Sequence, residues 1–175
     1  MSQNEVPFSF MTEPVVKEFG PYRAIGMNYK GKNENQEIPS LWSGPDGFIS
    51  RMKEVKPYNG PFMSFGLCRC ITGATDGSFE YIAAVPAADD AEIPEGMIEV
   101  QIPHCSYIVF PVRNLGELMQ TWNATQGWFA AQSEWETYCG PTQGCDCANH
   151  PFFELYPAEF NGSNEMFLYS PVRKK

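Results

Sequence analysis

Short apolar runs bounded by turn residues recur along this chain, and their lengths are typical of β-strands. The runs occupy residues 15–29, 62–72 and 79–85 in the first half, and 97–110, 152–156 and 166–171 in the second. The first run should bend at Gly20-Pro21, because proline cannot donate to a β ladder and therefore belongs at an edge or a bulge. The pattern predicts three strands in each half of the chain.

A helical segment follows the first strand of each half. In the first half it spans about residues 38–55, and Gly44-Pro45-Asp46-Gly47 should break it into two short pieces. In the second half, Asn114 is a candidate N-cap for a helix with apolar residues at i, i+3, i+4 and i+7. That helix should continue to about residue 131, and the polar, glycine-rich segment 133–149 should be a loop.

A short sequence repeat relates the two halves. Asn59-Gly60-Pro61-Phe62 recurs as Asn149-His150-Pro151-Phe152, at an offset of 149 − 59 = 90 residues. A period of this length is too long for a solenoid, so it indicates duplication of one βαββ unit. We therefore predict an α+β fold of one domain over residues 1–175, with antiparallel strands and the helices on one face. Its halves should be residues 10–87 and 97–173, joined by a hinge at 88–96.

Composition limits the classes of partner. Hydrophobic residues make up 43% of the chain and charged residues 19%, which is typical of a globular protein. Aromatic residues reach 14%, and such an excess often lines binding surfaces. The net charge of −9 repels phosphate backbones, so we expect no direct contact with nucleic acid. The charge favours cationic or neutral partners, unless it serves solubility alone.

The cysteines offer a candidate metal site. No signal-like or membrane-length apolar run is present, so we predict a cytoplasmic protein with all six cysteines reduced. Cys139, Cys145, Cys147 and His150 could hold zinc, but their spacing matches no common zinc finger, and we predict no metal and no cofactor. Cys68-x-Cys70 lies within a strand, where core filling is the expected role.

Known catalytic signatures are missing. The sequence holds no phosphate-binding glycine loop, no dinucleotide fingerprint and no Gly-x-Ser-x-Gly elbow. With His104 and His150 as its two histidines, the chain has few options for histidine-based nucleophilic catalysis.

The clearest candidate for function is a carboxylate in the middle of the fifth predicted strand. Side chains alternate along a strand, so Phe153 and Leu155 should pack under the helices while Phe152, Glu154 and Tyr156 share the other face. An unpaired charge is costly to bury, so a carboxylate between two aromatic residues needs an explanation. The alternative is that this face meets solvent and Glu154 is an ordinary exposed acid.

Four tryptophans lie on or near the predicted helices: Trp42, Trp122, Trp128 and Trp135. Indole rings provide flat walls for stacking and cation–π contacts, worth roughly 0.5–2 kcal/mol per cation. Core packing is the alternative, and it applies best to Trp122, which lies on the apolar face of its helix.

Several of these features together resemble the GyrI-like (gyrase-inhibitor-like, AraC-type) effector-binding domains. The resemblance rests on their order and spacing and runs from about Pro14 to Val172. It is carried by Pro39-Ser40-Leu41-Trp42, Thr121-Trp122, Trp128-Phe129, the Phe-Glu-Leu-Tyr strand and the opening strands around Val15 and Ile25. The segment at residues 44–47 and the cysteine-rich loop depart from the pattern.

This resemblance implies two SH2-like βαββ modules related by a pseudo-twofold axis, with a central groove that binds amphipathic drugs, often cations. The implied ligand-binding residues are Glu154, Tyr156, Phe152, Trp122, Trp42 and Trp128. Family members are often effector domains of bacterial transcription regulators. Because no helix-turn-helix precedes Pro14, this chain resembles the stand-alone members.

Two other functions follow from the same resemblance. Some stand-alone relatives hydrolyse cyclopropane-bearing DNA-alkylating antibiotics. In such an enzyme Glu154 would activate water while Tyr156 or Tyr22 donates a proton. Others inhibit gyrase, which would make a protein the partner. We expect small-molecule binding as the primary function.

Overall fold

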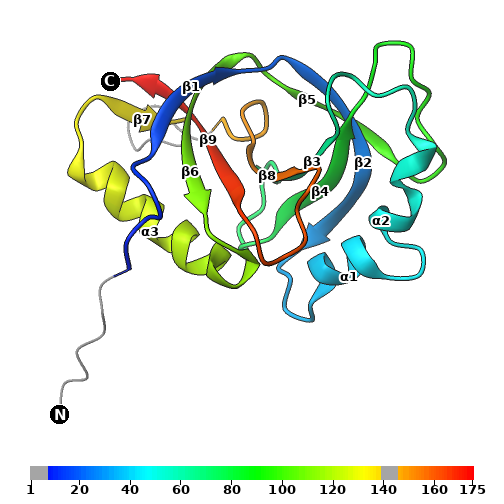
Figure 1. The fold of residues 1–175 in the computed structure, drawn as a ribbon, viewed down its shortest axis with the longest axis horizontal. Helices are drawn as coiled ribbons and strands as arrows, with labels where there is room; N and C mark the ends of the chain where they lie inside the picture. The colour runs from blue at the N-terminus through cyan, green and yellow to red at the C-terminus, as the bar shows by residue number, and fades with distance from the viewer. Residues whose placement is uncertain (1–7, 139–145) are drawn as a thin grey trace.

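The computed structural model describes residues 8–138 and 146–175, and its main feature is a curled antiparallel sheet (Figure 1). Its strands are β1 (Val15–Phe19), β2 (Tyr22–Gly31), β3 (Met63–Cys70), β4 (Phe79–Pro86), β5 (Ile98–Ile102), β6 (Cys105–Val112), β7 (Trp135–Thr137), β8 (Phe152–Pro157) and β9 (Met166–Lys174). All recorded pairings are antiparallel, and helices join the sheet in an α+β fold. The predicted fold class and strand direction are confirmed.

The strands follow the order β1-β6-β9-β8-β3-β4-β2-β5, and β7 pairs with β9 beside this path. At the centre, β8 pairs with β3, which joins the second half of the chain to the first. The ends are exchanged, because β1 pairs with β6 and β5 pairs with β2. The first strand of each half, β1 or β5, therefore pairs with a strand of the other half.

Two bends allow this exchange. The predicted bend at Gly20-Pro21 separates β1 from β2. The run 97–110 was expected to be one strand, but it is two, because the chain breaks at Pro103-His104 between β5 and β6. The two bends meet: a Cβ atom at Gly20 would lie 2.7 Å from the Pro103 carbonyl oxygen, so this contact requires glycine.

The helices agree closely with the predicted segments. The first segment divides at residues 44–47 into α1 (Glu37–Ser43) and α2 (Phe48–Arg51), and a 3-10 turn, η1 (Met52–Glu54), follows. The second segment begins with another 3-10 turn, η2 (Leu115–Glu117), and continues as α3 (Leu118–Ala131). Asn114 precedes η2, but its side chain makes no capping hydrogen bond. No helix of the described residues is long and apolar enough to cross a bilayer.

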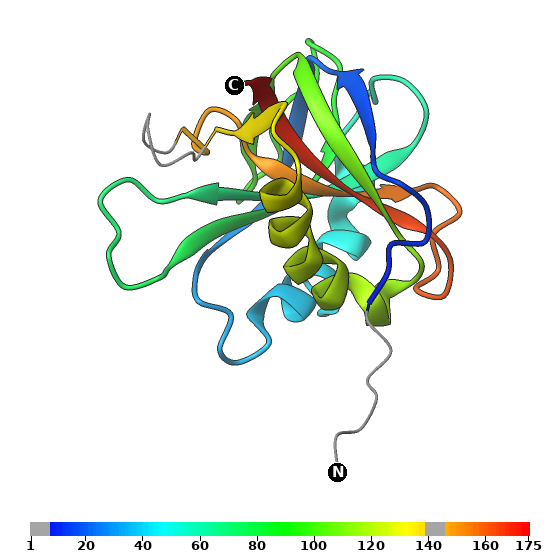
Figure 2. The ribbon, with the colours of Figure 1, turned by 90° about the vertical axis from the view of Figure 1, so that its left-hand side faces the viewer.

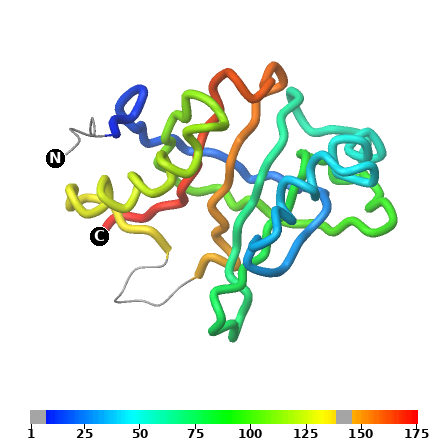
Figure 3. Tube along the Cα trace, turned by 90° about the horizontal axis from the view of Figure 1, so that it is seen from below, coloured from blue at the N-terminus to red at the C-terminus, as the bar shows by residue number. Residues whose placement is uncertain are grey.

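The helices all cover one face of the sheet. α1 and α2 pack on a cluster that includes Tyr81 and Val85, and α3 packs on a cluster that includes Phe110 and Leu168. Seen from below, β3 and β8 run side by side between α3 and α1 (Figure 3). The expected placement of the helices on a single face is confirmed.

The opposite face buries itself, because the sheet curls around it (Figure 2). There the rings of Phe153 and Tyr169 stack with their centroids 4.9 Å apart, and Phe65 and Tyr107 pack against Phe153. The expectation that Phe153 and Leu155 pack under the helices was therefore wrong. Both side chains belong to this strand-only core, and the other face of β8 meets the helices.

Hydrogen bonds from two arginines hold the loop that connects the halves. Arg23 donates from Nη1 to the carbonyl oxygens of Ala88 and Ala91, each at 2.8 Å. Arg51 donates to the carbonyl oxygen of Glu95, also at 2.8 Å. Residues 88–96 were expected to form a hinge, and they do form the loop, but two arginines of the first half hold its backbone in place.

The segment before β8 also differs from expectation. Residues 133–149 were predicted to be a loop, but β7 forms within them. Cys70 and Cys147 form a disulfide, with Cα atoms 5.7 Å apart, so the prediction that all cysteines are reduced was wrong for this pair. Cys70 is exposed instead of filling the core, whereas Cys68 is free and packs against the α1–α2 cluster.

Two glycines test the packing of the fold. A Cβ atom at Gly26 would lie 1.8 Å from the Ala83 carbonyl oxygen, so Gly26→Ala should lower the free energy of unfolding by about 3 kcal/mol. Gly127 is exposed on α3 with open space around it, so Gly127→Ala should raise that free energy by about 1 kcal/mol. Denaturant unfolding checks both changes, and equal effects would contradict this packing.

Candidate functional site

Glu154 lies in the middle of the sheet on the face that the helices cover. It is on β8, with Gly66 of β3 on one side and Leu168 of β9 on the other. Its side chain keeps part of its surface open to solvent. Protein atoms nevertheless surround it closely enough for burial to raise the pKa of the carboxyl group.

Two tyrosine hydroxyls donate to the same oxygen, Oε2 of Glu154. The Tyr81 hydroxyl donates at 2.8 Å from β4, and the Tyr156 hydroxyl donates from two residues along β8. Trp42 of α1 in turn donates from Nε1 to the Tyr81 hydroxyl oxygen at 2.9 Å. A chain of donors therefore runs from the first half of the protein to the carboxylate of the second half.

Gly66 makes the contact between Tyr81 and Glu154 possible. β3 lies between β4 and β8, so the Tyr81 side chain has to pass over β3 to reach the carboxylate. A Cβ atom at Gly66 would lie 2.1 Å from the Tyr81 hydroxyl and 2.5 Å from Glu154 Oε2. Any side chain at this position would occupy the space that the hydrogen bond needs.

Several aromatic rings lie on the same face of the sheet as the carboxylate. Trp42 meets Tyr156 edge-on with ring centroids 5.5 Å apart, and Phe160 packs on Tyr156 at 4.9 Å. Trp122 of α3 stacks on Phe152 at 4.2 Å with an interplanar angle of 23°. Rings from α1, β8 and α3 thus lie on the Glu154 face of the sheet.

The electrostatics of the site are unusual. Within residues 8–138 and 146–175, no basic side chain pairs with Glu154, and its recorded polar partners are the two hydroxyls. Burial also raises the pKa of Tyr81 and Tyr156, and the neighbouring carboxylate adds to that shift, so both phenols stay protonated as donors. The arrangement is a desolvated anion whose counter-charge is not supplied by the described residues.

The structure brings most of the expected ligand-binding residues together. Glu154, Tyr156 and Trp42 are in contact, and Phe152 with Trp122 lies beside them on the same face. Trp128 packs on the same apolar cluster, but its recorded ring contacts are with Phe110, edge-on at 5.5 Å, and with Phe129. Tyr22, the second candidate proton donor, is on the opposite face, where it packs on Phe19 and Phe65.

Tyr81 and Gly66 were missed by the sequence analysis. Strand alternation places Tyr81 on the face of Phe79, Ala83 and Val85, but nothing local indicates that β3 separates it from β8. A glycine in the middle of a strand was the available signal, since it often marks a close approach of neighbouring groups.

Two surface hollows lie away from this carboxylate. One, of about 440 Å³, is lined by Glu54, Lys56, Asp90, Glu92, Ile93, Pro94 and Glu95. The other, of about 160 Å³, lies beside β1 and β6 and includes Val15 and Val109. Neither is lined by Glu154.

The candidate metal ligands do not form a complete set. Cys147 is in the disulfide, which removes its thiolate, and the His150 ring stacks on Tyr138 at 3.7 Å. Cys139 and Cys145 lie outside the described residues. The absence of a metal therefore stays a prediction.

Replacing Tyr81 tests the donor chain. Tyr81→Phe removes a donor to Glu154 and leaves the Trp42 N–H without its acceptor. We expect a loss of about 1–3 kcal/mol in the free energy of unfolding, because a half-buried donor is left unsatisfied. The exposed Tyr58 is the control: Tyr58→Phe should change stability by less than about 0.5 kcal/mol in the same denaturant titration.

The raised pKa of Glu154 makes stability depend on pH. The native state holds this proton to a higher pH than the unfolded chain does. The contribution of Glu154 is therefore fully present below the unfolded pKa and is lost as pH rises through the folded pKa. Glu154→Gln should gain stability relative to wild type across that window, whereas the exposed Glu159→Gln should not. Parallel pH titrations of the unfolding midpoint check this, and a constant difference would contradict it.

Comparison with known proteins agrees with this architecture. Residues 16–172 match the Cass2 family, described as integron-associated effector binding protein. The transcriptional regulator BrlR of Pseudomonas aeruginosa is 27% identical over 156 residues, which cover 86% of this chain and 52% of BrlR. The chain therefore spans about half the length of that relative.

Two solved structures share the fold. SAV2435 bound to tetraphenylphosphonium aligns with a TM-score of 0.67 and 18% identity, covering 93% of this chain and 94% of that one. An integron cassette protein from the mobile metagenome of Vibrio cholerae aligns with a TM-score of 0.56 and 14% identity, covering 91% and 95%. The match to the family model spans most of the sequence, and it confirms the resemblance to GyrI-like domains. The chain belongs to the Cass2 family of integron-associated effector binding proteins.

Proposed function

We propose that this protein binds a small aromatic cation at Glu154. The observation that carries the proposal is the carboxylate itself, which is desolvated, held by two hydroxyls and without a basic partner among the described residues. A cationic ligand would supply the missing counter-charge. Because an unpaired buried charge is costly, part of the binding energy would come from removing that cost.

The aromatic rings would supply the remaining affinity. Trp42 and Tyr156 on one side, and Trp122 stacked on Phe152 on the other, offer ring faces and edges to an apolar cation. Such contacts contribute about 0.5–2 kcal/mol each, with the upper value reached when they are desolvated. The structure of SAV2435 with tetraphenylphosphonium supports this class of ligand, although that likeness concerns the fold. We infer that stacking gives affinity and that the carboxylate gives selectivity for charge.

The two halves are inferred to be duplicated SH2-like modules related by a pseudo-twofold axis. From the central β8–β3 pair outward, the sheet continues as β9-β6-β1 on one side and β4-β2-β5 on the other, and this matching order supports the inference. The ligand would bind in a central groove between α1 and α3, which belong to different halves. Failure of residues 97–173 to superpose on 10–87 would contradict the duplication.

The biological role is inferred to be ligand sensing in transcription regulation, within the cytoplasm. BrlR, of which this chain matches about half, is a transcriptional regulator, and this supports the role. The net charge of −9 argues against direct contact of this domain with DNA. Antibiotic hydrolysis and gyrase inhibition remain predictions from the sequence, and no observation of the site favours either over binding.

Matched ligands test the binding proposal. Tetraphenylphosphonium carries a positive charge, and triphenylphosphine oxide is a neutral compound with similar rings. We expect Glu154→Gln to weaken binding of the cation by about 1–3 kcal/mol, the cost of losing a charged partner, and to change binding of the neutral compound little. Isothermal titration of wild type and variant gives both affinities.

Glu159→Gln is the control for this experiment, because it removes one negative charge from an exposed turn just after β8. It should leave both affinities within about twofold, since exposed charges are screened. Equal losses for the cation and the neutral compound in Glu154→Gln would mean that Glu154 is structural. No binding of the cation to wild type would exclude the proposed ligand class.

A further inference from the structure

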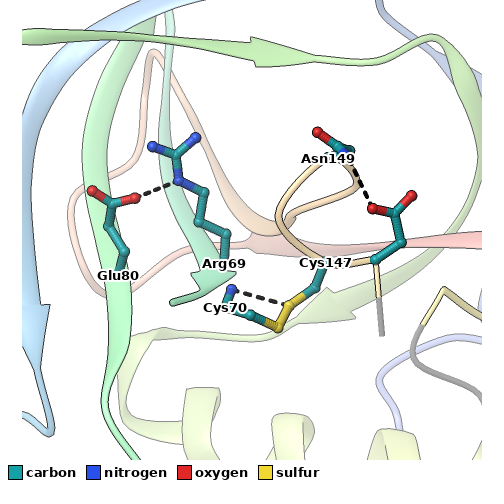
Figure 4. Close-up of a disulfide and its surroundings, with 6 residues drawn as sticks. Arg69, Cys70, Glu80, Cys147 and Asn149 are labelled. Carbon is teal, nitrogen blue, oxygen red and sulfur yellow. Dashed lines mark hydrogen bonds and ion pairs between the residues drawn. A yellow bond between two sulfur atoms is a disulfide. The ribbon is translucent and has the colours of Figure 1, made fainter. Parts of the chain in front are cut away.

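The disulfide between Cys70 and Cys147 lies at the end of the strand pair that holds Glu154. Cys70 is the last residue of β3, and Cys147 is in the turn before β8 (Figure 4). The backbone N–H of Cys70 also contacts Cys147 Sγ at 3.0 Å. Along β3, Cys68 pairs with Phe152 and Gly66 pairs with Glu154, so the disulfide continues the ladder that positions the carboxylate.

The beginning of β8 depends on few other contacts. β8 pairs with β9 at Phe153, Glu154 and Leu155, whereas its first residue, Phe152, has its ladder partner on β3 alone. Phe152 is also the residue whose ring stacks on Trp122. The segment that leads into Phe152 therefore determines where one aromatic ring of the proposed binding site lies.

Several hydrogen bonds form within the turn before β8. Asp146 donates from its backbone N–H to the Tyr138 carbonyl oxygen at 2.8 Å, and His150 donates to the Asp146 carbonyl oxygen at 3.0 Å. The Asn149 side chain donates to Asp146 Oδ1 at 2.9 Å, a bond that Figure 4 also shows. These bonds tie the turn to itself and to Tyr138 just after β7, but it is the disulfide that ties it covalently to β3.

We propose that the Cys70–Cys147 disulfide is a redox switch for the Glu154 site, and that its reduction weakens ligand binding. The inference rests on the proposed function. In the oxidised protein the disulfide holds the start of β8 against β3, so Phe152 and Glu154 are in position before the ligand binds. Affinity is higher when binding need not order the site.

A dithiol, one of the classes of reductant that keep cytoplasmic thiols reduced, would reduce this disulfide. One dithiol attacks the disulfide, and the Sγ–Sγ bond breaks through a mixed disulfide. The dithiol is oxidised to its own disulfide, and its two electrons and two protons end on the thiols of Cys70 and Cys147. Cys70 is exposed, so the attacking thiolate can reach the bond.

Coupling between the bond and the ligand has to be reciprocal. If reduction weakens binding by a given factor, bound ligand must shift the equilibrium of reduction by the same factor. A disulfide that only stabilised the whole fold would leave the affinity of the folded protein unchanged. This difference separates a switch from a simple crosslink.

The test measures tetraphenylphosphonium affinity for the oxidised protein and for the protein reduced with dithiothreitol. We expect reduction to weaken binding at least about fivefold. The Cys70→Ser/Cys147→Ser variant should bind with the reduced affinity whether or not dithiothreitol is present. Cys105→Ser, which removes a thiol that forms no disulfide, should respond to reduction as wild type does. Affinities that agree within twofold in oxidised and reduced wild type would overturn the proposal.

Hydrogen exchange separates this proposal from the function on which it rests. Reduction should speed exchange at the backbone amides of residues 152–154 and leave α1 unaffected. If the oxidised protein fails to bind tetraphenylphosphonium but this exchange still responds, the proposed ligand is wrong and the conformational coupling stands. If exchange at the start of β8 is unchanged, the switch is wrong even where the ligand binds.

Discussion

The rest of the structure depends on the pairing of β8 with β3 at the centre of the sheet, which joins the two halves and sets Glu154 beside Gly66. Glu154 lies in the middle of a sheet, under helices, and both of its hydroxyl donors must come from residues placed by the strand order. Tyr156 is supplied by the same strand, but Tyr81 has to cross β3 from the other half of the protein, and only a glycine at position 66 leaves room for it. The two hydrogen bonds to the carboxylate therefore require the observed register of β3, β4 and β8.

The two faces of the sheet have different roles because of this arrangement. On one face, Phe65, Phe153 and Tyr169 pack against each other as the sheet curls, so this core is formed by strands alone. The other face can then carry polar groups, because its apolar cover comes from helices that contact it at intervals. The candidate site lies on the helix-covered face, and the face opposite it is an apolar core.

The sequence predicted the elements well and their relations less well. Local signals were enough for the helix break at Gly44-Pro45-Asp46-Gly47 and for placing Glu154 on one strand face with Phe152 and Tyr156. Strand alternation grouped Phe153 with Leu155 on one face of β8. It could not show which of the two faces the helices cover, because alternation only separates the faces. The contact between Tyr81 and Glu154 joins residues 73 positions apart, and the disulfide joins residues 77 apart. Such pairings are decided by the order of strands in the sheet, which local patterns do not encode.

The exchange of first strands between the halves has a consequence for the history of the molecule. A half made on its own would lack one edge strand, since β1 pairs with β6 and β5 pairs with β2. If the halves arose from one shorter gene, its product would have completed its sheet by swapping that strand with a second copy. That product would then have been an obligate homodimer. At the 90-residue offset Glu154 corresponds to Ser64 and Tyr156 to Gly66, so after fusion through residues 88–96 the two halves would have diverged at the positions that now hold the acid and the space beside it.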